Sequence, residues 1–224
     1  MLSDNTKKSL DPKLKKRIRR AMLRERLAEM PGFRKAVLAD LRVLASSWDE
    51  RIDNETFTAS VIWKTIVYCW ETDAFLALVL YRLRVSMMRR RIPFLPRLMD
   101  KLSMMVAQVC IGDPVIIYPG LRLPHGQVVI DGATIIQSKV RIRPFVTIGL
   151  REGNYQGPTI ERGASIGTGA RVIGPVTLGR NCSVGANAVV VKNVPANTTV
   201  VGIPARPLEK GKQSENLEQQ NDID

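Results

Sequence analysis

The chain has 224 residues, of which 45% are hydrophobic, and a formal net charge of +13. This length and apolar content suit one large or two modest folded domains and exclude disorder of the whole chain. The longest apolar run, residues 74–81, is too short to cross a bilayer and the N-terminus is charged, so we expect a cytoplasmic protein without a signal peptide.

Basic residues gather in two segments, residues 13–26 and residues 89–97. Neither segment carries a nucleic-acid recognition motif or an aromatic stacking signature, so we do not expect nucleic acid as a partner. Two interpretations stay open: a solvated helix face, which we favour, and a basic amphipathic segment that contacts anionic lipid at the inner membrane face. The second rests on the apolar residues that lie among the arginines, namely Met87, Met88, Ile92, Phe94 and Leu95.

Residues 1–105 are predicted to form an α-helical N-terminal domain that includes the first basic segment. Apolar residues recur at helical spacing in residues 33–48 and again in residues 61–88. Breaks are expected at Pro31-Gly32, at the polar residues 53–56 and at Pro93 and Pro96. The core of this domain is predicted to contain five aromatic residues, Trp63, Tyr68, Trp70, Phe75 and Tyr81.

From residue 130 the apolar residues follow a period of six. Ten of the eleven positions at six-residue steps from 130 to 190 are Ile, Val or Leu, and the exception is Asn154. Helices and half-buried strands have shorter periods, so a period of six indicates short stacked units. Three six-residue faces make one triangular coil, which predicts a parallel β-helix of about five coils between Val115 and Pro204.

The sequence therefore predicts an α+β chain in three parts: the helical domain, a β-helix over residues 106–208 and a disordered polar tail over residues 209–224. Two features interrupt the β-helix. Ile117 and Leu123 lie one residue off the phase, which indicates an irregularity near His125. Residues 149–157 are predicted to leave the coil as a long loop that walls a cleft.

His125 is the single histidine of the chain. A lone histidine is usually structural, but this one lies between Pro124 and Gly126 at the start of the β-helix and close to the predicted loop. One histidine cannot supply the ligands of a metal-dependent carbonic anhydrase, and no serine-nucleophile, Walker or dinucleotide motif is present. General-base chemistry remains, in which a neutral imidazole takes a proton from an attacking hydroxyl, with Asp113 or Asp131 orienting the ring.

Several segments resemble the serine acetyltransferase branch of the hexapeptide-repeat acyltransferases. They are FVTIG at 145–149, GPTI at 157–160, the repeats from 166, the closing VGIPAR at 201–206, and the helical segment 73–88 around Tyr81-Arg82. The resemblance implies a left-handed β-helix and acetyl-CoA as the donor; we expect no metal, because one histidine and three widely spaced cysteines do not suit a metal site. It also implies a homotrimer with active sites between subunits, and a hexamer formed through the helical domain stays open.

The resemblance assigns roles to individual residues. His125 matches the catalytic base. Five positions match the donor site: Gly149, Thr168 and Ala186 along the pantetheine arm, and Lys192 and Arg206 at the phosphates. On the predicted loop, the candidates for acceptor contacts are Arg151, Tyr155 and Gln156.

Departures from the family pattern decide the expected acceptor. Pro124 replaces the aspartate that precedes the catalytic histidine, Gly157 replaces a second active-site histidine, and the acids that hold the serine ammonium group have no clear match. An ammonium group buried without a carboxylate is costly, which favours a neutral hydroxyl acceptor such as a sugar of a surface polysaccharide or glycan precursor.

We therefore expect an acetyl-CoA-dependent O-acetyltransferase that acts on a sugar hydroxyl by direct attack, with His125 as the base. The first alternative is a serine O-acetyltransferase of cysteine biosynthesis. The second alternative, from another functional class, is a non-catalytic β-helix scaffold. An acyl carrier protein in place of CoA is a less favoured donor.

Overall fold

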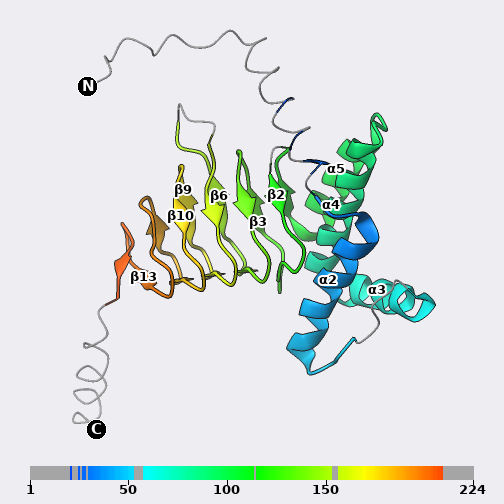
Figure 1. Cartoon of the computed structure of the whole chain (residues 1–224), viewed down its shortest axis with the longest axis horizontal. Coiled ribbons are helices and arrows are strands. Elements are labelled where there is room, and N and C mark those ends of the chain that lie inside the picture. The colour runs from blue at the N-terminus through cyan, green and yellow to red at the C-terminus, as the bar shows by residue number, and fades with distance from the viewer. Residues whose placement is uncertain are drawn as a thin grey trace.

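A computed structural model describes residues 30–52, 58–113, 115–152 and 156–208, together with residues 21, 25, 27 and 28. Tyr155, the predicted tail and most of the basic segment 13–26 lie outside the described residues. Figure 1 shows helices gathered at one end of a long prism of short strands, whose last strands lie at the opposite end. The predicted fold, an N-terminal helical part followed by a left-handed β-helix, is confirmed.

The helical part contains four described α-helices. Their bounds are α2 Phe33–Ala45, α3 Ala59–Glu71, α4 Asp73–Arg89 and α5 Leu95–Ala107, with a short 3₁₀ helix, η1 Ser46–Trp48, after α2. The segment 61–88, expected to be helical throughout, is two helices because Thr72 is extended, with φ −135° and ψ 102°. Threonine followed by aspartate suits a helix start, since both residue types compete with the helix interior for backbone partners.

The predicted aromatic core is only partly correct. Tyr68, Phe75 and Tyr81 are buried, but Trp63 is 66% exposed and Trp70 is 90% exposed. Helix α3 projects from the rest of the helical part (Figure 1) and packs through the face that carries Val61 and Tyr68, so its two tryptophans lie on the outside.

The β-helix has three sheets, which we name A, B and C in the order in which the chain visits them. Sheet A contains β1 Val109–Ile111, β3 Val128–Ile130, β6 Thr147–Gly149, β9 Arg171–Ile173 and β12 Val189–Val190. Sheet B contains β2 Ile116–Ile117, β4 Ile135–Ile136, β7 Thr159–Ile160 and β10 Thr177–Leu178. Sheet C contains β5 Arg141–Ile142, β8 Ser165–Ile166, β11 Ser183–Val184, β13 Thr199–Val201 and β14 Arg206–Pro207. All strand pairs are parallel except β13 with β14.

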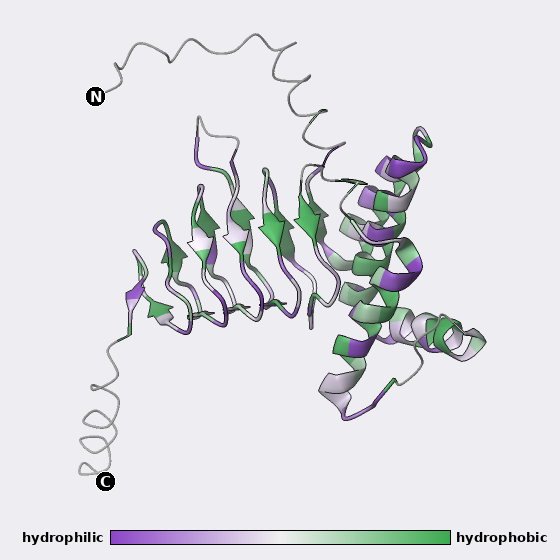
Figure 2. Cartoon of the chain, in the orientation of Figure 1, coloured by the Kyte–Doolittle hydropathy of each residue, from purple (hydrophilic) through white to green (hydrophobic). Residues whose placement is uncertain are grey.

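The six-residue period is confirmed as the core of the prism. The ten aliphatic side chains on the predicted phase are at most 3% exposed, and Figure 2 shows the hydrophobic residues along the strands. The first coil starts at Val109, earlier than the predicted Val115. The chain runs from Ile148 in sheet A to Ile160 in sheet B, twelve residues instead of six, so the loop inserts one whole period and the phase survives.

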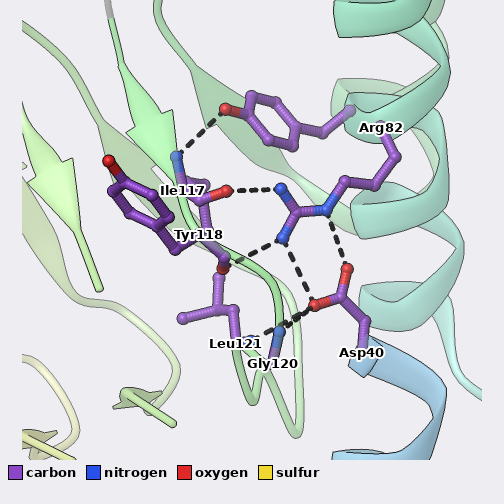
Figure 3. A network of polar contacts seen from close by, with 7 residues as sticks. Asp40, Arg82, Ile117, Tyr118, Gly120 and Leu121 are labelled. Carbon is purple, nitrogen blue, oxygen red and sulfur yellow. Dashed lines mark hydrogen bonds and ion pairs between the residues drawn. The ribbon is translucent and has the colours of Figure 1, made fainter. Parts of the chain in front are cut away.

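A buried ion pair joins the helical part to the first coil (Figure 3). Arg82 Nε on α4 lies 2.8 Å from Asp40 Oδ2 on α2, and both side chains are 1% exposed. The same guanidinium donates to the carbonyl oxygens of Ile117 and Tyr118. Asp40 Oδ1 accepts from the backbone N–H of Gly120 at 2.6 Å and of Leu121 at 3.3 Å. Two side chains therefore satisfy four backbone groups of the first coil.

Tyr81 and Arg84 extend this junction along α4. The Tyr81 hydroxyl donates to the Val115 carbonyl and accepts from the Ile117 N–H, each at 3.2 Å. Arg84 Nη1 donates to the Ile111 carbonyl at 2.8 Å and to Asp100 Oδ1 on α5 at 2.7 Å. Burial is the main cause that raises the pKa of Tyr81 above its ordinary value, so the hydroxyl keeps its proton. One face of α4 thus fixes the orientation of the helices on the prism.

Asp40→Ala is expected to destabilise the protein by about 3–5 kcal/mol, because it leaves a buried guanidinium without its carboxylate. Replacing both members of a simple buried ion pair by apolar residues often restores stability. Here the double variant Asp40→Leu/Arg82→Met is expected to stay destabilised, because four backbone groups of the first coil lose their hydrogen-bond partners. Denaturant unfolding would measure both, with the exposed Arg51→Ala as a control. Full recovery in the double variant would contradict this account of the junction.

Candidate active site

His125 lies at the edge between sheets C and A of the first coil, which we name the C–A edge. Leu123 and Ile130 are seven residues apart there, whereas Ile142 and Ile148 in the next coil are six apart. The register fixes this comparison, because Ile142 N–H donates to the Arg122 carbonyl and Phe145 N–H donates to the Gln127 carbonyl. The first coil therefore carries one extra residue at this corner, which confirms the predicted irregularity.

Gly126 holds the corner against the end of α5. A Cβ added at Gly126 would lie 1.8 Å from the carbonyl oxygen of Ala107, so no other residue fits there without a shift of backbone. That same oxygen accepts a hydrogen bond from the Gln127 N–H at 2.8 Å. The close approach fixes the backbone on the C-terminal side of His125, whose own side chain is exposed.

A cavity of about 310 Å³ opens beside His125 between the helical part and the first coil. It is lined by Leu44 in the last turn of α2 and Ser47 and Trp48 of η1, by Glu71, Thr72, Asp73 and Ala74 at the α3–α4 junction, and by Arg122, Pro124, His125 and Gly126 of the corner. We name it the His125 pocket. Its walls come from three stretches that are far apart in the sequence.

The His125 pocket holds charges of both signs. Glu71 and Asp73 bring two exposed carboxylates, and neither forms an ion pair within the described part of the chain. Arg122 brings a cation, and partial burial followed by the nearby Arg141 and Arg143 lowers its pKa from the ordinary value. A guanidinium still keeps its charge at neutral pH, so this crowded cation favours an anionic ligand.

The expected orienting acids lie elsewhere. Asp113 Oδ1 is 3.7 Å from Arg84 Nη1, in a different cavity between α4, α5 and β1. Asp131 follows β3, with its carboxylate beside Gly112. Both lie past the far ends of sheet A strands, whereas His125 precedes a sheet A strand, so neither aspartate lines the His125 pocket. The suggestion that one of them orients the imidazole is therefore wrong within one chain.

Two of the predicted donor residues share the C–A edge with His125. Thr168 and Ala186 occupy the equivalent corners of the third and fourth coils, where Asn187 N–H donates to the Thr168 carbonyl at 2.8 Å. Gly169 N–H donates to the Pro144 carbonyl at 3.0 Å, which continues the stack toward the first coil. The stack forms a straight edge that runs away from His125.

The remaining predicted residues lie at other places on the prism. Gly149 and Arg151 lie at the edge between sheets A and B, the A–B edge, where Arg151 and Lys192 line a groove of about 700 Å³. No atom lies within 4 Å of a Cβ added at Gly149. Gln156 is exposed at the end of the same loop, and Arg206 is exposed at the last strand of sheet C. One chain does not bring these residues to His125.

Sequence reasoning missed Glu71, Asp73 and Arg122 as neighbours of His125. The only sequence signal was the polar Glu71-Thr72-Asp73 inside an otherwise apolar helical segment, which marks a helix break. Nothing in the spacing indicates that this break meets a corner of the prism about fifty residues later, because the contact depends on how α4 docks on the first coil.

Comparison with known proteins supports acyl transfer as the class of chemistry. The family model described as "Bacterial transferase hexapeptide (six repeats)" matches residues 157–192. A serine acetyltransferase of Synechococcus elongatus is 35% identical over 64% of this chain and 59% of its own length. A serine acetyltransferase of Helicobacter pylori is 34% identical over 61% of this chain and 81% of its own length. The chain thus spans less than two thirds of the first relative and most of the second.

A solved structure shows a similar arrangement. The serine acetyltransferase of Neisseria gonorrhoeae in complex with serine is 28% identical, with a TM-score of 0.64, over 77% of this chain and 68% of that chain. These relatives overturn the prediction of a sugar acceptor and of a role in polysaccharide biosynthesis. The physical reason for the error is that carboxylates reach the pocket from the α3–α4 junction, a source that the sequence motifs did not reveal.

Gly126→Ala is expected to destabilise the protein by about 1–3 kcal/mol, because the new methyl group collides with a backbone oxygen that cannot turn away. Thermal unfolding would measure the loss. Gly149→Ala is the matched control for stability, since its methyl group meets open space. Equal stability of the two variants would contradict the close approach between the corner and α5.

Proposed function

The chain belongs to the serine acetyltransferase family, and on that basis we propose that it is a serine O-acetyltransferase, which moves the acetyl group of acetyl-CoA to the serine hydroxyl. The observation that carries the proposal is the composition of the His125 pocket. It places one imidazole, two carboxylates and one guanidinium around a single small cavity.

Free serine presents three groups that match this set. Its ammonium group pairs with Glu71 or Asp73, and its carboxylate pairs with Arg122, so neither charge enters the cavity without a partner. Its hydroxyl is left for His125. A neutral sugar hydroxyl would form no ion pair with the three charged side chains of the pocket, so it would gain less binding energy there than serine.

The reaction follows from the imidazole. His125 takes the proton of the serine hydroxyl as the oxygen attacks the thioester carbonyl carbon of acetyl-CoA. The tetrahedral intermediate collapses with loss of the CoA sulfur, which takes the proton back from the imidazolium, so O-acetylserine and CoA leave and the histidine is neutral again. Burial raises the pKa of the Cys69 and Cys182 thiols to about 11, and neither lines the His125 pocket, so direct transfer needs no covalent intermediate.

The donor is acetyl-CoA. We place its pantetheine arm along the C–A edge, where Thr168 and Ala186 form corners in line with His125. Lys192 and Arg206 are exposed cations near the last coil, suited to phosphates, and Arg151 shares the groove of Lys192. No described residues form a group of three or more potential metal ligands.

A homotrimer would bring the separated residues together. His125, Thr168 and Ala186 lie on the C–A edge, whereas Gly149, Arg151 and Lys192 lie on the A–B edge. If the C–A edge of one subunit faces the A–B edge of the next, the contact joins two different surfaces and closes as a ring. We propose the trimer on this geometry, with Arg151 and Gln156 reaching the acceptor site of the neighbour. The pairing of two trimers into a hexamer stays a prediction.

His125→Ala is expected to lower serine-dependent release of thiol from acetyl-CoA by about 10²–10⁴-fold, because the serine hydroxyl loses its base. Acetyl-CoA binding, measured by calorimetry, is expected to change little. Serine turnover that survives the substitution would contradict the mechanism. Absence of serine turnover in the parent protein, with acetyl-CoA still bound, would contradict the proposed acceptor.

Asp73→Asn and Glu71→Gln are expected to raise KM for serine by about tenfold or more, and the double variant further, since the ammonium group loses a charged partner. KM for acetyl-CoA is expected to stay constant. Glu161→Gln on the edge between sheets B and C is the matched control. If the variants at Asp73, Glu71 and Glu161 have the same KM for serine, the carboxylates of the His125 pocket do not hold the substrate.

A further inference from the structure

Helix α5 presents two apolar faces, of which only one is covered. Met99, Ser103 and Ala107 are buried and recur every four residues on the face toward the rest of the protein. Leu95, Leu98 and Met105 follow helical spacing on a neighbouring face and are 41%, 47% and 80% exposed. The helix therefore carries an apolar stripe to the surface, which we name the α5 stripe.

Phe94 extends the α5 stripe at the turn before the helix. Its side chain is 84% exposed although it is large and apolar. Its backbone has φ +64°, a left-handed conformation that is unusual for a bulky residue. Figure 1 shows the turn between α4 and α5 at the tip of the helical part. The chain thus holds a phenyl ring outward in a backbone conformation that costs free energy, without burying the ring.

Cations surround the α5 stripe. Arg90, Arg91, Arg97 and Lys101 are exposed, and none of them forms a salt bridge within the described residues. At 100° per residue, Arg97 and Lys101 lie on the side of the stripe away from the buried face. The one acid in residues 89–101 is Asp100, and it is engaged by the buried Arg84 at 2.7 Å. The local charge is therefore strongly positive.

We propose that the α5 stripe and its cations form a docking surface for an anionic lipid bilayer. Phe94, Leu98 and Met105 enter the boundary between headgroups and acyl chains, while Arg91, Arg97 and Lys101 meet the lipid phosphates. No helix of the described chain is long and apolar enough to cross a membrane. A second copy of the same surface is a poorer partner, because it would bring the two sets of cations together.

This docking is independent of the proposed activity. The α5 stripe shares no residue with the His125 pocket, and the two lie on different elements of the helical part. Loss of membrane binding is therefore expected to leave serine turnover in solution unchanged, and the failure of either proposal can be told from the failure of the other.

Co-sedimentation of the full chain with lipid vesicles tests the proposal. Vesicles of phosphatidylcholine are compared with vesicles that contain about one third phosphatidylglycerol. We expect binding to the anionic vesicles only, and weaker binding at high salt. Phe94→Ser/Leu98→Gln and, separately, Arg91→Glu/Arg97→Glu are each expected to lower the partition coefficient at least about tenfold.

Two control variants match these changes elsewhere. Ile66→Gln/Trp70→Gln removes exposed apolar groups from α3, and Arg162→Glu/Arg180→Glu reverses exposed charges on the β-helix; both are expected to keep vesicle binding. Equal binding by the α5 variants and the parent would overturn the proposal and move the contact to another basic segment. Absence of binding to any vesicle by the parent protein would also overturn the proposal. So would α5 variants that bind vesicles like the parent but change the oligomer mass in light scattering.

Discussion

The buried pair of Asp40 and Arg82 is the interaction on which the arrangement of the two parts depends. A guanidinium and a carboxylate out of contact with water are stable only with their hydrogen bonds satisfied, and here the partners are backbone groups of the first coil. The pair therefore specifies where α2 and α4 sit on the prism. Because Leu44 lies in the last turn of α2, Trp48 belongs to η1 directly after it and Asp73 begins α4, the same docking decides which side chains face His125.

The His125 pocket is formed by two kinds of structure, the β-helix and the helical part. The β-helix supplies a rigid corner in which an extra residue and Gly126 fix the backbone beside His125, the proposed base. The helical part supplies the carboxylates that, in the proposed function, select an amino acid over a neutral alcohol. On this proposal, chemistry and specificity come from different parts of the chain, and the acceptor follows from how the parts dock rather than from the repeat itself.

The sequence predicted the prism well because its signal is local and repeated. From Ile130 to Val190 the same requirement, an aliphatic side chain in the dry triangular core, recurs at every sixth residue except Asn154. The step across the loop is twelve residues, so the six-residue period continues after it. The helical part was predicted less well: Trp63 and Trp70 read as core residues but lie on a projecting helix. The acceptor was wrong for a related reason, since Glu71 and Asp73 reach His125 only through tertiary docking, which leaves no periodic trace. The trimer and the donor residues on the two edges of sheet A stay predictions.

We propose that the His125 pocket is a serine site built jointly by both parts of the chain, and the single histidine allows a direct measurement. Nuclear magnetic resonance of protein labelled with ¹³C at the histidine Cε1 reports one imidazole signal, from His125. We expect this signal to shift and saturate as serine is added in the presence of CoA, and we expect Asp40→Ala, which loosens the docking of the helices, to remove the response. A signal that serine leaves unchanged while CoA binds would contradict a serine site at His125.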